Sequence, residues 1–479
     1  MIVCPIRYSG VVLFIKENTM KKSFSRFSAP FTAVLFVSCS AIVAVADPGL
    51  FDHSGVQMLA HLTLADFGPQ NIYGNDSWGY VSPTGREYVL MGLSDELAVV
   101  EITTPTSPVI VGSVPHTHGL WSDVKVFGDH AFVVNEEAGG VQSIDLSGVD
   151  AGVVTLDGTF FAGAIPTSHN IAINEASGYA YLCGPAVSGE GIVAIDLSNP
   201  VNLTVAGQWS IGIYVHDAQI VSYTDGPYAG REIAFCAAGP DGLYIVDVTD
   251  KASMFTVSSM TYPNLGYTHQ GWLNADRSYF YLNDEEDELF GLVSSTTTRV
   301  IDVSDLANPT LVSVFTNGVQ SIDHNLYIRD GILYESNYTS GLRLFDLRDP
   351  AEILNPSEIG YFDTSPAAPV AIAAPAAGIE HADHPDGVGS FQFGGAWNVV
   401  PFFPSGVVAV SDLDSGLFIL DPSEALKLPN PADLNGDGVV NGADLAILLI
   451  EWGNAGASDF NNDGVINGAD LAILLTNWG

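Results

Sequence analysis

The sequence predicts an all-β, seven-bladed β-propeller followed by a small α-helical module in which a calcium-binding loop and a helix occur twice. Two observations support the propeller. Short alternating strands recur at a period of roughly 40–50 residues, and these repeats lack the 3.6-residue periodicity of helices. One observation supports the module: the chain ends in two nearly identical segments, DLNGDGVVNGADLAILLIEWG and DFNNDGVINGADLAILLTNWG.

The repeats are recognised by their closing strand, as in GLYIVDVTD, TTRVIDVSDLANP, GLRLFDLRDP, GIVAIDLSNP and GLFILDPSE. Each is an alternating strand that ends in an acid and often runs into a proline. Adding GVQSIDLSG and ELAVVEITTP gives seven closing acids: Glu101, Asp145, Asp196, Asp247, Asp302, Asp346 and Asp421. The unit around Asp346 contains four strands, LVSVFTN, HNLYIR, ILYESNY and GLRLFDL, and four antiparallel strands make one propeller blade.

The strand type represented by LVSVF lacks a seventh copy within the repeats, and the N-terminal segment QMLAHLTL matches it. We therefore expect QMLAHLTL to complete the last blade, which closes the ring and hides its open edges. The last repeat also contains a Pro/Ala-rich insertion at about 363–396, expected to be a surface loop. The predicted propeller spans 47–424, and a Pro-rich linker at 425–432 leads to the C-terminal module, residues 433–479.

Residues 1–46 are typical of an export leader. A basic stretch after Met20 precedes an apolar run over 31–45, and Ala44-Val45-Ala46 forms a small-residue cleavage site. We expect translation to start at Met20 and the protein to be secreted or associated with the cell surface. The alternatives are an uncleaved membrane anchor, for which the apolar run is short, and lipidation at Cys39. We expect no membrane span in the mature chain.

Composition restricts the class of partner. Hydrophobic residues make up 47% of the chain and charged residues only 15%, which indicates a packed globular protein. The formal net charge of −40 repels phosphate backbones, so no nucleic-acid partner is expected. Once the leader is removed, only Cys183 and Cys236 remain, in the matching phrases AYLCG and IAFCA. They form either one disulfide between adjacent repeats or two buried free thiols.

Together with NIYGNDSWGYVSPTGREYVLMG and FGGAWNVVPFFPSGVVAVSDLDSGLFIL, the repeats resemble the choice-of-anchor B family, whose LVIVD-type repeats GLYIVDVTD matches most closely. The resemblance covers about residues 56–422. It implies an exported propeller with a C-terminal attachment module that differs between members, and it implies no established activity.

Histidines recur at one position of the repeats. The second strand of successive units opens with the pairs Trp78-Gly79, Ser122-Asp123, His169-Asn170, His216-Asp217, His269-Gln270, His324-Asn325 and Trp397-Asn398. That strand lines the channel of a propeller, so four histidines are expected near one mouth. Each pair should contribute one side chain, because successive strand residues point to opposite faces. His169, His216, Asp217, His269 and His324 are thus a candidate channel site. The alternatives are structural contacts between blades, a ligand or metal site, and catalysis.

Other acidic stretches are weaker candidates. The run DEEDE at 284–288 is expected to be a solvated turn on an acidic surface. The sequence EHADHPD at 380–386 has metal-ligand residue types, but it lies in the insertion, where a polar loop is the default. No nucleophile elbow, Walker loop or HExxH motif is found, so we assign no catalytic residue.

Both C-terminal segments fit the twelve-residue calcium loop, with oxygen ligands at positions 1, 3, 5, 7, 9 and 12 and glycine at position 6. The predicted ligands of two Ca²⁺ ions are Asp433, Asn435, Asp437, Val439, Asn441 and Asp444 in the first loop, and Asp459, Asn461, Asp463, Val465, Asn467 and Asp470 in the second. The Pro-rich segment before the first loop cannot form the entering helix of an ordinary EF-hand.

This loop–helix duplication resembles type I dockerin modules, which bind cohesin modules on scaffolds or cell surfaces. Many dockerin modules are part of polysaccharide-degrading proteins. The resemblance places partner recognition at loop positions 10 and 11, which are Gly442, Ala443, Gly468 and Ala469. Cellulosomal dockerins often carry hydroxyls there, and this chain does not. Because both copies match, either helix is expected to be able to present the docking face.

Three functional hypotheses follow. The first is a non-catalytic, exported binding protein attached to a cohesin-like partner or surface scaffold through its calcium module. The second is a polysaccharide-active hydrolase or lyase that uses a His/Asp site at the channel mouth. The third is a purely structural surface component without a ligand.

Overall fold

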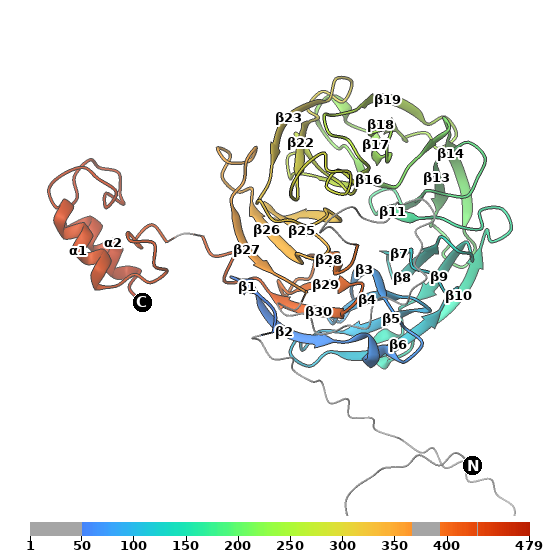
Figure 1. Ribbon diagram of the computed structural model, residues 1–479, viewed down its shortest axis with the longest axis horizontal. Coiled ribbons are helices and arrows are strands. Elements are labelled where there is room, and N and C mark those ends of the chain that lie inside the picture. The colour runs from blue at the N-terminus through green and yellow to red at the C-terminus, as the bar shows by residue number, and fades with distance from the viewer. Residues whose placement is uncertain (1–49, 366–392, 429) are drawn as a thin grey trace, which may run out of the picture. The chain divides into compact units, whose positions relative to one another are not determined.

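The structure is a computed structural model that describes residues 50–365, 393–428 and 430–479. Seven antiparallel sheets surround a central axis and form a β-propeller (Figure 1). The predicted fold class is therefore confirmed. The predicted leader at 1–46 and most of the insertion at 363–396 lie outside the described residues. Among the described residues, no helix is long and apolar enough to cross a membrane.

Each blade has four main strands, which follow one another from the channel outward. The first blade consists of β3 (Gly74–Val81), β4 (Glu87–Leu93), β5 (Glu96–Glu101) and β6 (Val109–Pro115). The second consists of β7 (Ser122–Phe127), β8 (His130–Asn135), β9 (Val141–Asp145) and β10 (Thr155–Phe160). The third consists of β11 (Asn170–Asn174), β12 (Tyr179–Cys183), β13 (Glu190–Asp196) and β14 (Thr204–Trp209), and the short β15 (Ile213–Tyr214) pairs in parallel with β13.

The fourth and fifth blades consist of β16 (Asp217–Ser222), β17 (Glu232–Ala237), β18 (Leu243–Asp247) and β19 (Phe255–Met260), and of β20 (Thr268–Leu273), β21 (Tyr279–Asp284), β22 (Thr298–Asp302) and β23 (Thr310–Phe315). The sixth consists of β24 (Leu326–Arg329), β25 (Ile332–Ser336), β26 (Leu342–Asp346) and β27 (Glu358–Phe362), and the short β1 (His53–Ser54) adds to its edge. Three 3₁₀ turns occur in the connections: η1 (Leu64–Phe67), η2 (Val149–Ala151) and η3 (Gly226–Tyr228).

The seventh blade joins the two ends of the propeller. It consists of β28 (Ala396–Val400), β29 (Val408–Asp412), β30 (Gly416–Asp421) and, outermost, the N-terminal β2 (Gln57–Leu62). Gln57 pairs with Asp421 and Leu62 with Leu417 in an antiparallel ladder. This pairing confirms that the QMLAHLTL segment closes the ring. The first strands of successive blades lie beside one another, and β28 lies beside β3, so the ring is complete.

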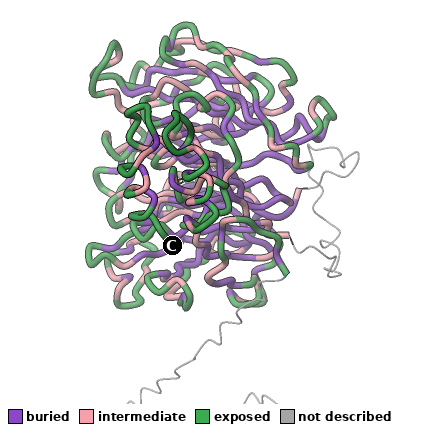
Figure 2. Tube along the Cα trace, turned by 90° about the vertical axis from the view of Figure 1, so that its left-hand side faces the viewer, coloured by how far each residue is buried: buried purple, intermediate pink, exposed green. Residues whose placement is uncertain are grey.

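The blades are held together by apolar strands that are buried on both faces. Every residue of β4 is buried, as is every residue of β17. Such strands need near-continuous apolar sequence, because a neighbouring blade covers each face. In Figure 2 buried stretches run through the interior of the propeller, and exposed stretches lie on its outer turns.

The closing acid of the repeats has a structural role. Asp145, Asp196 and Asp302 each accept a hydrogen bond from the backbone N–H two residues further on, at 2.7, 2.8 and 2.9 Å. Asp247 and Asp421 do the same. An aspartate that bonds to the amide two residues ahead stabilises the turn that ends the strand. The repeat signature therefore encodes the turn and provides no information on ligand binding.

Cys183 and Cys236 are both free thiols, buried in one apolar cluster between the third and fourth blades. Of the two alternatives for this pair, the structure therefore shows two buried free thiols and not a disulfide.

The C-terminal module contains two helices, α1 (Gly442–Glu451) and α2 (Gly468–Thr476), each preceded by one of the duplicated loops. Its core consists of a few small and medium side chains: Ala432, Val440, Leu448, Ile466 and Leu474. The sequence pattern therefore gives a loop and a helix twice, as expected.

Candidate functional site

The first loop of the C-terminal module is folded by its own acidic side chains. The carboxylate of Asp433 accepts hydrogen bonds from the amides of Gly438, at 2.7 Å, and Asp437, at 3.2 Å. Asp437 in turn accepts one from Val439 at 3.0 Å. Gly438 has a φ of 85°, a left-handed conformation that favours glycine. The loop curls around an oxygen-rich centre.

The second loop repeats this arrangement residue by residue. Asp459 accepts from Gly464 at 2.8 Å, and Asp463 accepts from Val465 at 3.0 Å. Gly464 has a φ of 88°. Both loops place only oxygen donors at the predicted positions, which is the donor set that Ca²⁺ prefers.

The last loop residues join each loop to its helix. Asp444 is fully buried, and its two oxygens accept from the amides of Leu434 and Asn441, at 2.8 and 2.7 Å. These backbone hydrogen bonds lower the pKa of Asp444. The side-chain oxygen of Asn441 accepts from Ala443 and caps α1. Asp470 and Asn467 occupy the same places at the start of α2. Oδ1 of each aspartate accepts a second hydrogen bond, from Asn435 or Asn461, whereas Oδ2 accepts one and retains a lone pair for a cation.

The predicted histidines gather at the channel. We call the pocket that they line the histidine pocket; it is small and is lined by Asp76, Trp121, Ser122, His169, Asn170, His216, His269, His324, Asn325 and Trp397. The four imidazole rings form a fan, with centroids 4.1 Å apart from His169 to His216, 4.2 Å from His216 to His269 and 4.3 Å from His269 to His324.

Backbone carbonyls orient two of these rings. Nδ1 of His216 lies 2.9 Å from the carbonyl oxygen of His269, and Nδ1 of His324 contacts the carbonyl oxygen of Trp397. Because a carbonyl oxygen only accepts, Nδ1 must carry the proton in both rings. In His324, whose pKa burial lowers to about 3, Nε2 then carries the lone pair.

A glutamate outside the predicted site completes the cluster. Glu285 follows β21, and its carboxylate lies 3.6 Å from Nε2 of His269 and 3.8 Å from Nε2 of His324. The hydroxyl of Tyr338 donates to it at 2.6 Å. A second glutamate, Glu136, lies 2.7 Å from Nδ1 of His169. Both glutamates follow the second strand of their blade, which was the available sequence signal.

The histidines differ in charge. Burial lowers the pKa of His269 well below its usual range, and it lowers the pKa of His324 to about 3. Burial also opposes protonation of His169, but the carboxylate of Glu136 outweighs it and raises the pKa of His169. His269 and His324 are therefore neutral at physiological pH, whereas His169 forms an ion pair.

Two details of the predicted site are wrong. Asp217 is not one of the described residues that line the pocket; burial raises its pKa to about 7 against the attraction of Lys125. Some pairs contribute both side chains, such as His324 and Asn325. The strict alternation of a strand does not apply there, because β24 begins only at Leu326.

The first blade also departs from the expected alignment. Trp78 is not among the described lining residues and packs instead against Tyr327 and Phe402. A bulge in β3 between Gly74 and Ser77 shifts the register, so that Asp76 reaches the pocket.

Two family models match the chain. The model for the type I dockerin domain covers residues 431–477, which contain both loops and both helices. The C-terminal module is a type I dockerin domain. The model for the LVIVD repeat matches residues 168–210, 233–261 and 298–317, within the third, fourth and fifth blades. Type I dockerin domains bind calcium and mediate assembly with cohesin modules, and they occur in extracellular or cell-surface proteins.

No curated protein matches the chain. Several solved structures resemble it at low identity. A functionally unknown protein from Desulfotomaculum acetoxidans DSM 771 is 15% identical, with a TM-score of 0.42 over 57% of this chain and 82% of the other. The hydrazine synthase of Kuenenia stuttgartiensis is 12% identical, with a TM-score of 0.46 over 73% and 96%. A chain of the COPII outer coat vertex on membranes is 11% identical, with a TM-score of 0.48 over 72% and 83%.

The dockerin helices each expose one apolar face. On α1 the exposed residues are Gly442, Ala443, Ala446, Leu449 and Ile450, and on α2 they are Gly468, Ala469, Ala472, Leu475 and Thr476. Leu449 and Leu475 are 54% and 53% exposed, and Ile450 is 81% exposed. The predicted recognition residues at the start of each helix are thus continuous with an exposed apolar stripe.

The acidic run at 284–288 is not a solvated turn, because all five side chains are buried. Asp284 accepts from the hydroxyl of Tyr262 at 2.8 Å, and Asp287 forms an ion pair with the buried Arg299. Burial, reinforced by Asp323, raises the pKa of Glu288, which is therefore protonated. Arg299 lies on β22, so only the folded blade supplies the charge that permits this burial.

Proposed function

We propose that this protein is an exported, non-catalytic β-propeller that attaches to a cohesin-like module or surface scaffold through its calcium-loaded dockerin domain. One observation carries the proposal: two loops with the same oxygen-donor pattern each lead into a helix with an exposed apolar face. A module that only stabilised the end of the chain would not need to repeat that face. The leader at 1–46 supports delivery to the outside of the cell.

Calcium would be held by the twelve predicted ligands, six in the loop from Asp433 to Asp444 and six in the loop from Asp459 to Asp470. The ion supplies positive charge that offsets the repulsion between three loop aspartates, which would otherwise oppose the folded loop. Asp444 ties the loop to its helix, because it accepts hydrogen bonds from loop amides while lying in the first turn of α1. Folding of the loop and folding of its helix are therefore coupled, and a cohesin-like partner recognises the folded helices.

Docking would occur at Gly442 and Ala443 on α1, or at Gly468 and Ala469 on α2. The small side chains leave room for close approach, and Leu449 or Leu475 extends the contact along the helix. Since the two faces are near copies, either helix can dock, and the loss of one should be tolerated.

A binding experiment tests the proposal. The full chain is titrated with a panel of purified cohesin modules, with Ca²⁺ or with a chelator. We expect at least one pair to bind only in Ca²⁺. Ala443→Asp or Ala469→Asp alone should weaken this binding only a few-fold, because the other face remains. The double variant should lose at least about 2 kcal/mol, or roughly 30-fold in affinity.

Ala457→Asp is the matched control, because it places the same charge on an exposed residue between the helices. Binding that is equally tight in chelator, or a double variant that binds as well as this control, would contradict docking through these faces.

A polysaccharide-active enzyme is the second candidate, and the histidine pocket is the observation that favours it. Neutral imidazoles beside a glutamate can accept or donate protons during hydrolysis or elimination. A turnover screen with polysaccharides tests this candidate. Activity that disappears in His216→Ala and His269→Ala, with the fold intact, would favour the enzyme; no turnover of any substrate would favour the binding protein.

A further inference from the structure

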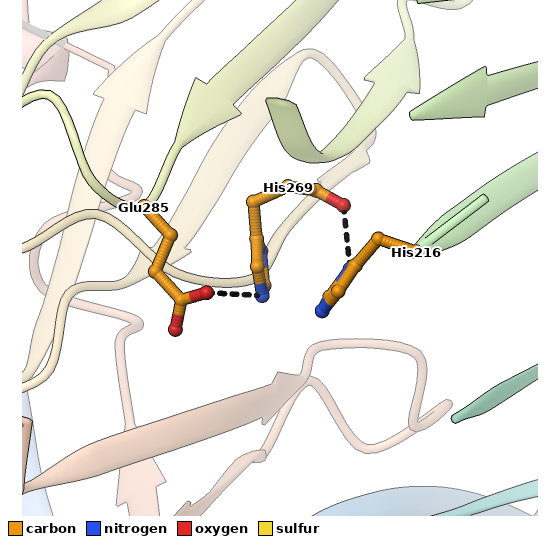
Figure 3. Close-up of side chains that lie close together, drawn as sticks. All are labelled: His216, His269 and Glu285. Atoms are coloured by element: carbon orange, nitrogen blue, oxygen red, sulfur yellow. Dashed lines mark hydrogen bonds and ion pairs between the residues drawn. The ribbon is translucent and has the colours of Figure 1, made fainter. Parts of the chain in front are cut away.

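Three side chains from two adjacent blades converge in the histidine pocket. His216 precedes β16, His269 lies on β20 and Glu285 follows β21 (Figure 3). One nitrogen from each imidazole and one carboxylate oxygen all lie within 4.8 Å of one another. Nε2 of His269 lies 3.6 Å from Oε2 of Glu285. Ligands of a single metal ion need to approach one another in this way.

Neighbouring groups prepare these side chains as ligands. The carbonyl oxygen of His269 holds Nδ1 of His216, so Nε2 is the ring nitrogen that is available to a metal ion (Figure 3). The hydroxyl of Tyr338 donates to one oxygen of Glu285 and fixes its carboxylate. Metal-binding histidines and carboxylates in proteins are commonly oriented by such outer hydrogen bonds.

The three side chains are also enclosed by the protein. His216, His269 and Glu285 are 5%, 1% and 9% exposed, so a bound ion would be shielded from bulk water. The rest of the pocket, including Trp121 and Trp397, leaves space for a water molecule beside the three ligands.

We propose that His216, His269 and Glu285 form a binding site for a transition-metal ion of the Zn²⁺ class, with an open coordination position facing the histidine pocket. Two imidazole nitrogens and one carboxylate oxygen are typical of such metals, whereas Ca²⁺ and Mg²⁺ prefer ligand sets made of oxygen alone. The site is therefore distinct in chemistry from the two dockerin loops.

The flanking histidines have other roles. His169 is committed to its ion pair with Glu136. His324 lies 3.8 Å from the second oxygen of Glu285, and its Nδ1 contacts the carbonyl oxygen of Trp397. His324 is therefore held by Trp397 and makes no hydrogen bond to Glu285, because its Nε2 carries a lone pair and the carboxylate can only accept. The inference does not depend on docking, because no residue of the dockerin domain contributes to it.

Zinc binding by the full chain tests the inference. Excess Ca²⁺ is present throughout, so that the dockerin loops are saturated. After equilibration with Zn²⁺ and dialysis, we expect one Zn²⁺ per chain. Co²⁺ should show the visible absorption of a four-coordinate site with nitrogen ligands. His269→Gln and Glu285→Gln should each weaken Zn²⁺ binding by about 100-fold or more. Loss of a residue that only orients a metal ligand costs up to about 100-fold, and loss of a ligand itself should cost at least as much.

His118→Gln is the matched control, because His118 also pairs with a carboxylate, Asp95, but outside the pocket. It should bind Zn²⁺ like the unaltered protein. Failure of the unaltered protein to retain Zn²⁺, or full retention by both His269→Gln and Glu285→Gln, would overturn the inference. Should a variant not fold, anomalous scattering from Zn²⁺-soaked crystals of the unaltered protein decides the question. A peak among the three side chains supports the site, and peaks only elsewhere overturn it.

Discussion

Removal of calcium should unfold the dockerin domain and leave the propeller intact. The core of the domain has only five buried apolar side chains, the three largest of which are Leu448, Ile466 and Leu474; Leu434, Leu445, Phe460 and Leu471 are partly buried against them. Each large side chain contributes about 1.5–3 kcal/mol on burial, which is little for a module of this size. Two ions at about 100 times their dissociation constant would each add about 2.7 kcal/mol, or roughly 5 kcal/mol together. The bound ions therefore supply a contribution comparable to that of the core.

Hydrogen exchange on the full chain measures this directly. In chelator, the amides of α1 (Gly442–Glu451) and α2 (Gly468–Thr476) should lose protection, whereas those of central strands such as β4 should not change. At a fixed Ca²⁺ concentration, Leu448→Ala should cost about 2–5 kcal/mol of local stability. Its exposed neighbour gives the control, because Leu449→Ala should cost far less. Unchanged protection of both helices in chelator would refute the reasoning.

Two further predictions concern the propeller. Cys183 and Cys236 are fully buried, and burial raises the pKa of both thiols. Neither thiol should therefore react with a thiol reagent until the chain is unfolded in denaturant. Rapid reaction of the native protein would contradict this prediction. Burial raises the pKa of Asp412 to about 7, so its contribution to stability is complete below its unfolded pKa near 4 and is lost as the pH rises through 7. In the unaltered protein, the free energy of unfolding should therefore fall by roughly 4 kcal/mol at most between pH 4 and pH 8. Denaturant titration should show that this fall is absent in Asp412→Asn and retained in Asp421→Asn, a variant in the same blade.

Much of the fold could be predicted because its signals are local. A closing acid such as Asp196 bonds to an amide two residues away, so each blade carries its own turn signature in the sequence. Ring closure by β2 also followed from the pattern, because one strand type lacked a copy. The two dockerin loops are equally local, since every predicted ligand lies within twelve residues of the others.

The missed features depend on contacts between distant residues. Glu285 belongs to a run of acids that resembles a solvated turn, and only the folded blades bring it beside His269 and His324. Burial of the same run requires Arg299 from the next strand. The displacement of Trp78 arises from a bulge, which has no clear signal in a single sequence. Local patterns therefore predicted the strands, the turns and the shared position of the four histidines, but not the acidic side chains that meet them.

The pairing of β2 with β30 has a consequence for how the protein matures. Strands within one blade are close in sequence and can associate early in folding. The seventh blade cannot do so, because it needs Gln57 and Asp421 together. Contacts between such distant residues form slowly, since the intervening chain must first be ordered. During that delay the unpaired edges of β30 and β2 are open to strands from other molecules, so a high concentration of folding chains should favour strand-exchanged oligomers over closed monomeric rings.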